Sequence, residues 1–182
     1  DGLLRMAWVA GKRPRRERLD LAALARDVVA RLRETDPSRT VEVVLPSAAP
    51  AFADPELMNV VLGELLGNAW KFTAPVTEAR IELGTEAGPG ETEFFVRDNG
   101  VGFDEAYEQK LFGPFQRLHP VGEFAGEGIG LAVVSRAIRS HRGRIWASGT
   151  PGKGATIFFF LPDEVVAKPE SEAPADLSLP DR

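Results

Sequence analysis

The segment ELLGNAWKF, residues 64–72, places polar side chains inside an otherwise apolar helical pattern. Glu64, Asn68 and Phe72 are spaced four apart and so share one helix face. Lys71 lies at the edge of that face. A carboxylate and an amide lose free energy on burial unless partners or ligands satisfy them. A solvated polar face explains the pattern, and so does a metal-phosphate site. Amide and carboxylate oxygens suit Mg²⁺ and its water shell, and a lysine can meet phosphate.

The sequence DNGVGF, residues 98–103, directly follows a predicted strand. Aspartate and glycine occur in any turn, so an ordinary turn is one interpretation. A carboxylate held at a strand end can also accept a hydrogen bond from an exocyclic amine, and Gly100 and Gly102 would let the backbone approach a flat base. Adenine carries such an amine, whereas guanine presents the opposite pattern at that ring position. Asp98 is therefore a candidate adenine-binding residue.

Glycines alternate in GEGIGL, residues 126–131, at the start of a predicted helix. Gly126, Gly128 and Gly130 expose backbone N–H groups near the positive end of the helix dipole, an arrangement that binds phosphate. The spacing is not that of the Rossmann fingerprint, and the chain contains no GxxxxGK[ST] loop. The patterns therefore disfavour dinucleotide and P-loop sites.

The phenylalanines of FGPFQR, residues 112–117, lie in a stretch that we expect to be mostly mobile. Phenylalanine is poorly suited to solvent, so these side chains should dock on the domain or on a partner. His119 follows in the same stretch, where a solvated loop residue is the expected role and phosphate contact is the alternative.

Periodicity predicts the elements that must position these residues. Three helices are expected at 20–36, 54–72 and 129–141, and five strands at 41–45, 79–84, 92–97, 144–148 and 155–161. Between residues 98 and 130 we expect mostly loop, with one short helix near 104–112.

Composition excludes several classes of protein. The chain has 182 residues, 22 basic and 27 acidic, so its formal charge of −5 argues against a general nucleic-acid or anionic-membrane binder. It has no cysteine and only two histidines, which excludes thiolate chemistry and disfavours a multi-histidine metal centre. No apolar run is long enough to span a membrane. His141 ends a predicted helix, where a capping or surface role is expected.

These motifs in this order resemble the ATP-binding catalytic domain of sensor histidine kinases over about residues 35–162. ELLGNAWKF resembles the asparagine box, DNGVGF the first glycine box, FGPF the phenylalanine box and GEGIGL the second glycine box. GKGATIFFFLP resembles the last strand of that domain. The residues that flank the motifs look most like those of phytochrome-type kinases.

The resemblance implies an α/β fold, a two-layer sandwich of a mixed β-sheet packed on three helices (Bergerat-type), that binds ATP and Mg²⁺. It implies that Asn68 ligates Mg²⁺ beside Glu64, and that Asp98 reads the adenine amine. Lys71 and Arg117 would contact phosphates, and Thr156 would lie near the adenine. The other residues implied at the nucleotide are Phe72, Gly100, Gly102, Gly126, Gly128, Gly130 and Leu131.

The expected organisation has three parts: the end of a dimerisation helix and a basic linker at 1–18, the catalytic domain at 19–162, and a disordered acidic, proline-rich tail at 163–182. The chain begins with Asp1 rather than Met, so we expect a fragment or a processed product. The implied activity is transfer of the γ-phosphoryl group to a histidine on a dimerisation domain outside this chain. A response regulator would receive it next, and the parent protein would be a cytoplasmic homodimer.

Glu64 leaves alternatives open, because many family members carry asparagine there. Related ATP-hydrolysing enzymes of the gyrase and mismatch-repair type carry a glutamate as the base for water. Glu64 would then act as a base or orient the water shell of the metal. An ATP hydrolase, a non-catalytic nucleotide-binding interaction module and a serine kinase of the anti-sigma type are the alternative functions.

Overall fold

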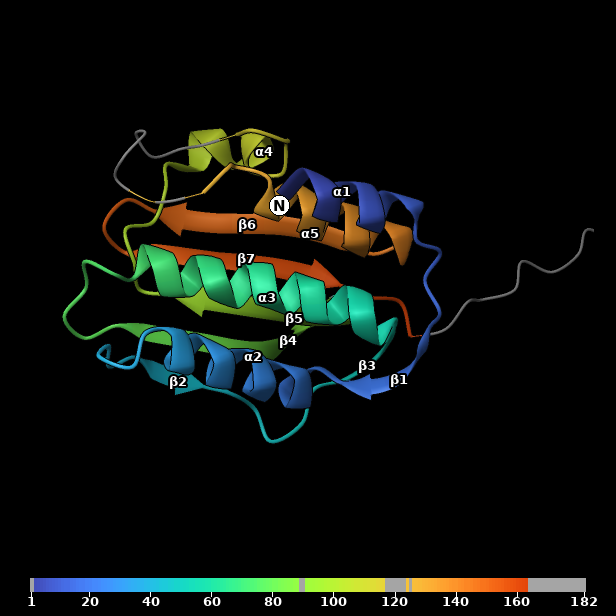
Figure 1. The fold of residues 1–182 in the computed structure, drawn as a ribbon, viewed down its shortest axis with the longest axis horizontal. Helices are drawn as coiled ribbons and strands as arrows, with labels where there is room; N and C mark the ends of the chain where they lie inside the picture. The colour runs from blue at the N-terminus through green and yellow to red at the C-terminus, as the bar shows by residue number, and fades with distance from the viewer. Residues whose placement is uncertain (1, 89–90, 117–123, 125, 164–182) are drawn as a thin grey trace, which may run out of the picture.

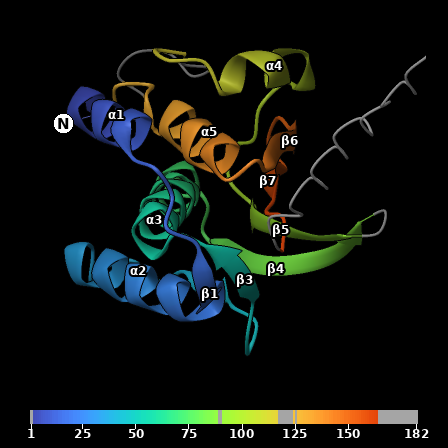
Figure 2. The ribbon, with the colours of Figure 1, turned by 90° about the vertical axis from the view of Figure 1, so that its right-hand side faces the viewer.

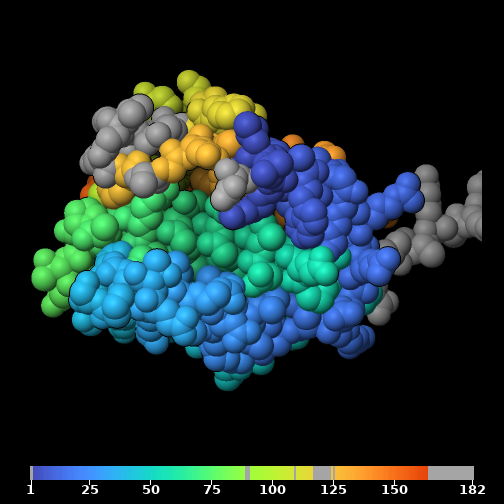
Figure 3. Space-filling model, viewed as in Figure 1, coloured from blue at the N-terminus to red at the C-terminus, as the bar shows by residue number. Residues whose placement is uncertain are grey.

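The computed structural model describes residues 2–88, 91–116, 124 and 126–163, with the side chain of residue 109 left out. Three helices, α2 (Leu21–Thr35), α3 (Pro55–Phe72) and α5 (Gly130–Ser140), lie on one face of a sheet (Figures 1 and 2). Helix α1 (Gly2–Gly11) packs beside α5. In the space-filling view α3 is visible as a strip between α2 and α1 (Figure 3). The predicted two-layer α/β sandwich is confirmed.

The sheet has five strands in the order β2-β4-β5-β7-β6. Only the β2–β4 pair is parallel, so the sheet is mixed as predicted. A residue at the end of β5 lies between β4 and β7, which places Asp98 opposite Ile81 and Ala155. The strands are β2 (Glu42–Val44), β4 (Arg80–Gly88), β5 (Glu91–Asp98), β6 (Arg144–Thr150) and β7 (Gly154–Phe160).

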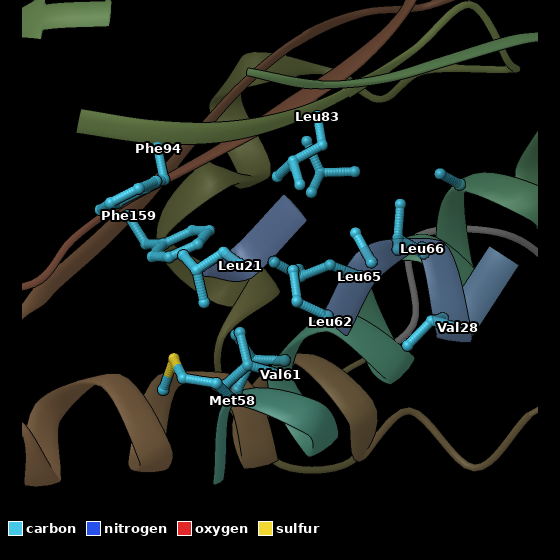
Figure 4. Close-up of a cluster of buried hydrophobic side chains, with 14 of the residues drawn as sticks. Leu21, Val28, Met58, Val61, Leu62, Leu65, Leu66, Leu83, Phe94 and Phe159 are labelled. Carbon is cyan, nitrogen blue, oxygen red and sulfur yellow. The ribbon is translucent and has the colours of Figure 1, made fainter. Parts of the chain in front are cut away.

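Helix α3 is central because its apolar residues face both the sheet and the neighbouring helices. Asp54 caps its first turn by accepting a hydrogen bond from the backbone N–H of Leu57, and Pro55 occupies the first turn, where a missing N–H costs nothing. Figure 4 shows side chains from α3, the sheet and α2 meeting in one core. The labelled members are Leu21, Val28, Met58, Val61, Leu62, Leu65, Leu66, Leu83, Phe94 and Phe159, each 5% exposed or less.

A second, two-stranded sheet was not predicted. Strand β1 (Glu17–Asp20) pairs antiparallel with β3 (Pro50–Ala53). Each strand has only four residues and neither shows a clear apolar alternation, so the sequence carries no periodic signal for them. Residues 17 and 18 therefore begin a strand, and the boundary predicted after residue 18 falls inside it.

Helix α1 lies within the N-terminal segment 1–18. Val9 is only 1% exposed and belongs to the core, so the segment is anchored on the domain.

A 3₁₀ turn (Glu105–Tyr107) and α4 (Glu108–Leu111) form the short helical stretch predicted near 104–112. None of the helices in the described part of the chain has the length and apolar content that crossing a membrane requires.

The surface role considered for His141 is wrong. The residue follows α5, as expected of a cap, but it is 0% exposed. Its Nε2 accepts a hydrogen bond from the backbone N–H of Asp54 at 2.9 Å, so Nδ1 carries the proton and donates to the carbonyl of Ala137 at 2.8 Å. Burial, followed by the repulsion of Arg16, lowers the pKa of His141 and keeps the ring neutral.

Candidate functional site

A cavity of about 360 Å³ lies where α3, α5 and α1 meet the ends of β5 and β7. This volume falls within the range of small-molecule sites. Its walls combine apolar side chains with a few polar groups from separate elements. The lining residues are Gly2, Arg5, Glu64, Leu65, Asn68, Ala69, Lys71, Phe72, Val96, Asp98, Gly102, Phe103, Leu111, Gln116, Phe124, Gly126, Glu127, Gly128, Ile129, Gly130, Leu131, Val133, Ala155 and Ile157.

The polar face of α3 forms one wall of this cavity, and Glu64, Asn68 and Lys71 all line it. The Asn68 side chain makes no hydrogen bond to any residue that the structure describes. Glu64 is different, because its carboxylate forms an ion pair with Arg5 of α1. A free amide and a paired carboxylate therefore lie one helical turn apart.

Asp98 provides the carboxylate at the sheet end of the cavity. Its Oδ1 accepts a hydrogen bond from the backbone N–H of Gly100 at 2.8 Å, and the N–H of Ala155 also donates to the carboxylate. Burial outweighs these bonds and raises the pKa of Asp98 to about 6. A partly buried acceptor with such a pKa gains most from a ligand that donates a hydrogen bond to it.

The turn after Asp98 is tied to its neighbours on both sides. The backbone N–H of Val101 donates to the carbonyl of Phe72 at 3.1 Å, and that of Gly152 donates to the carbonyl of Val101 at 2.7 Å. Gly102 has a φ of +64°, and a Cβ there would come within 2.0 Å of the Thr150 carbonyl oxygen. A side chain at this position would therefore displace the turn from the cavity.

Two glycines that the sequence reasoning did not select also shape this corner. Gly154 has a φ of +91°, and a Cβ there would lie 1.9 Å from the carbonyl oxygen of Asp98. A Cβ at Gly149 would lie 2.4 Å from the ring of Phe103, which lines the cavity and is 7% exposed. The sequence GKG, residues 152–154, is the pattern from which Gly154 could have been predicted.

The second glycine cluster lies over the end of α3. Gly126 and Gly128 have φ values of +137° and +71°, where glycine is strongly favoured. A Cβ at Gly126 would lie 3.4 Å from the Lys71 ammonium nitrogen. The rings of Phe72 and Phe124 meet edge to face with centroids 5.1 Å apart. Backbone N–H groups, a lysine and an aromatic pair therefore share one side of the cavity.

Most of the predicted site residues line this single cavity. They are Glu64, Asn68, Lys71, Phe72, Asp98, Gly102, Gly126, Gly128, Gly130 and Leu131. Gly100 lies behind it, since a Cβ there would meet the carbonyl oxygen of Phe72 at 2.4 Å. Arg117 and His119 lie outside the described residues.

Thr156 does not lie where the resemblance implied. Ile157 lines only the cavity, and Ala155 lines both the cavity and a second depression. Thr156 lines only that second depression, on the opposite face of the sheet, and accepts a hydrogen bond from Arg97 at 3.2 Å. Successive side chains of a strand point to opposite faces, and this alternation decides the placement.

Two lining residues of α1, Gly2 and Arg5, were missed. They lie at least 59 positions from the motif residues that they contact, and α1 carries no motif of its own, so no local signal points to them. The two phenylalanines of the FGPF stretch differ in exposure. Phe112 is partly buried, while Phe115 is 62% exposed with a φ of +60°.

The donor set at the cavity suits a hard cation held jointly with a ligand. No group of three or more histidine, aspartate or glutamate side chains in the described residues could enclose a metal. Mg²⁺ commonly takes one or two protein oxygens and completes its shell with phosphates and water. Asn68 offers such an oxygen, and Glu64 lies one turn before it in the same wall.

Known proteins match the chain over this region. Residues 53–165 match the family described as "Histidine kinase-, DNA gyrase B-, and HSP90-like ATPase". Cyanobacterial phytochrome A of Nostoc sp. is 43% identical over 98 residues, which are 54% of this chain and 13% of that protein. The methanogenesis regulatory histidine kinase FilI of Methanothrix harundinacea is 39% identical over 126 residues, 69% of this chain and 14% of that protein. The chain thus spans about one seventh of these relatives.

Solved structures show the same fold. Full-length ShkA, determined in complex with AMPPNP, superposes with a TM-score of 0.70 at 25% identity, covering 88% of this chain and 34% of that one. The mycobacterial sensor histidine kinase MprB superposes with a TM-score of 0.65 at 23% identity, covering 81% of this chain and 97% of that one.

Proposed function

Since the chain belongs to the family of histidine kinase-, DNA gyrase B- and HSP90-like ATPases, we propose that it is the catalytic domain of a sensor histidine kinase. The domain would bind ATP with Mg²⁺ and transfer the γ-phosphoryl group to a histidine on a separate dimerisation domain. The observation that carries the proposal is the shared cavity, which is lined both by Asp98 and by the polar face of α3.

Asp98 would recognise the adenine. Its carboxylate accepts hydrogen bonds from Gly100 and Ala155 and faces the cavity, so it can accept one more from an exocyclic amine. Guanine would place a carbonyl oxygen opposite the same carboxylate and be repelled. Apolar contact would come from the neighbouring Val96, Phe103 and Ile157, which line the same wall.

The triphosphate would lie toward the second glycine cluster. Lys71 lies close to Gly126, and backbone N–H groups at the start of α5 add positive potential. Mg²⁺ would be held by Asn68 and by phosphate oxygens, and it would neutralise charge that develops on the transferred group. Phosphoryl transfer depends mainly on such positioning and charge neutralisation.

The acceptor histidine would come from outside the chain. His141 is fully buried and bonded at both ring nitrogens, so it cannot reach the cavity as a nucleophile. We therefore expect no stable self-phosphorylation of these 182 residues. As part of the same proposal, residues 1–18 would be the end of a dimerisation helix, here α1, and a basic linker. A response regulator would receive the phosphoryl group, and the parent protein would be a cytoplasmic homodimer.

Calorimetric titration with a non-hydrolysable ATP analogue, with and without Mg²⁺, tests the proposal. We expect binding that Mg²⁺ strengthens, a loss of about 100-fold in affinity for Asp98→Asn, and weaker Mg²⁺ dependence for Asn68→Ala. Thr156→Val is the matched control, because this residue lies on the other face of the same sheet and should leave affinity unchanged.

Two results would contradict the proposal. One is unaltered affinity for Asp98→Asn, which would remove adenine from this wall. The other is equal binding of ATP and GTP analogues, because a carboxylate that reads the exocyclic amine must distinguish them.

Hydrolysis of ATP is the second candidate function, since Glu64 lines the cavity and a carboxylate there can act as a base toward water. Steady release of phosphate that Glu64→Gln abolishes, without transfer to a supplied histidine domain, would favour it.

A further inference from the structure

Helix α1 lies across one side of the cavity and is anchored along its whole length. The backbone N–H of Gly2 donates to Glu127 at 3.0 Å, Val9 is buried in the core, and Lys12 pairs with Asp54 at 3.2 Å. Figure 3 shows α1 beside the residues that precede α5, on the surface above α3. The helix is therefore a wall of the cavity, with Arg5 as its charged side chain.

Arg5 engages the one carboxylate on the α3 wall. Its guanidinium forms an ion pair with Oε1 of Glu64. The other oxygen, Oε2, lies against the backbone of Gly130, where a Cβ would come within 2.4 Å of it. The Glu64 side chain is only 18% exposed. Arg5 therefore holds Oε1 of Glu64, and Oε2 lies next to Gly130.

We propose that Arg5 is a positioning residue: by holding the carboxylate of Glu64, it suppresses the attack of water on the γ-phosphoryl group. This inference depends on the proposed function. In hydrolysis a water oxygen bonds to the γ-phosphorus, and the bond between the γ-phosphorus and the β–γ bridging oxygen breaks. ADP leaves with that electron pair, and Glu64 takes the proton of the water. Arg5 suppresses the step because it holds the oxygen that would take the proton.

Release of inorganic phosphate from ATP by the 182-residue chain measures the effect. Arg5→Met should raise the release rate by at least about ten-fold, since a general base contributes on the order of 10²–10⁴ to such a step. Arg5→Lys should restore most of the suppression, because it keeps the charge. The double variant Arg5→Met/Glu64→Gln should fall back to the wild-type rate.

Arg26→Met is the matched control. Arg26 is also about half exposed and also pairs with one carboxylate, that of Asp20, but it lies on α2 away from the cavity. Its variant should leave phosphate release unchanged.

Two readouts without turnover accompany the assay. The affinity for a non-hydrolysable ATP analogue should stay within about two-fold in Arg5→Met, because Arg5 acts on Glu64. Amide hydrogen exchange of residues 2–11 in the nucleotide-free protein should become faster, because the helix loses an anchor.

The inference is overturned if Arg5→Met binds the analogue normally but releases phosphate no faster. It is also overturned if the increase persists in the double variant. Faster exchange of α1 with an unchanged release rate would show that Arg5 only anchors the helix. Failure of the wild-type chain to bind the analogue would instead remove the proposed function.

Discussion

The polar residues at the two ends of helix α3 differ in whether the fold provides them with hydrogen-bond partners. At its start Asp54 is 2% exposed and fully paired, with Oδ1 accepting from Leu57 at 3.0 Å and Oδ2 from Arg15 at 2.9 Å. Its own N–H donates to buried His141. In the second half of the helix, Asn68 points into a cavity and has no partner among the described residues.

The contrast extends to two aspartates, the buried Asp54 and the partly buried Asp98. Burial alone would raise both pKa values. At Asp54, hydrogen bonds from Arg15 and Leu57 and the charge of Lys12 more than offset burial, so its pKa is lowered. At Asp98 the two backbone bonds do not offset it, and the pKa rises to about 6. One carboxylate is thus satisfied by the fold, and the other is left for a ligand.

Removing the paired aspartate should have the largest effect. Asp54→Ala deletes a helix cap and an ion-pair partner of Lys12, and it should lower the free energy of unfolding by about 3 kcal/mol. Urea denaturation measures this loss. Affinity for the ATP analogue should stay near wild type under conditions where the variant is folded. A loss below about 1 kcal/mol would mean that the pairing contributes little.

Neutralising Asp98, which has backbone hydrogen bonds but no ion-pair partner among the described residues, should have the opposite effect on stability. Asp98→Asn keeps an acceptor for the N–H of Gly100 and removes a charge that burial penalises. Since the folded pKa of about 6 lies above the ordinary value of 3.8, ionisation of Asp98 destabilises the fold as pH rises through about 6. The variant should therefore gain about 1–2 kcal/mol near pH 8 and nothing near pH 3, after allowance for partial exposure.

Thermal melts of nucleotide-free protein across this pH range measure the gain, alongside the loss of nucleotide affinity already predicted. If Asp98→Asn destabilised the protein near pH 8, the carboxylate would be a structural group and the contrast with Asp54 would disappear.

His141 should give a pH dependence of the other sign. Its pKa is lowered in the folded state from the ordinary value of 6.5, so protonation favours the unfolded chain. Its contribution to stability is complete above about pH 6.5 and is lost as the pH falls below that value. His141→Gln, which does not titrate, should flatten this part of the stability profile measured by urea denaturation. An unchanged slope would contradict the buried neutral ring.

Glycine substitutions should give the smallest effects. They compare Gly130 of α5, which lines the cavity, with Gly67 of α3, which does not. A Cβ at Gly67 meets nothing within 4 Å, so Gly67→Ala should stabilise the helix by about 0.5–1 kcal/mol and leave nucleotide affinity unchanged. Gly130→Ala introduces a Cβ 2.4 Å from Glu64 Oε2 and 3.8 Å from Asn68 Nδ2, so it should lower affinity by crowding the proposed Mg²⁺ and phosphate site beside Asn68. Equal behaviour of the two variants in titration and melting experiments would show that Gly130 has no special role.

Much of the candidate site could be predicted because its residues lie in short motifs. The i, i+4 spacing of Glu64 and Asn68 specifies a shared helix face whatever the rest of the chain does. Thr156 shows where such reasoning fails: a one-residue difference along a strand exchanges the faces of the sheet, and no motif specifies that register. The pair β1–β3 was missed because four-residue strands carry no periodicity of their own.

The layered fold, the three helices and the polar groups that form most of the cavity follow from local sequence, because helix periodicity, caps and glycine turns act over a few neighbouring residues. The contacts of Arg5 with Glu64 and of Asp54 with His141 across 87 positions, and the raised pKa of Asp98, come from the packing of the folded chain. Those contacts depend on how distant helices pack, and packing is set by the shape of the whole core.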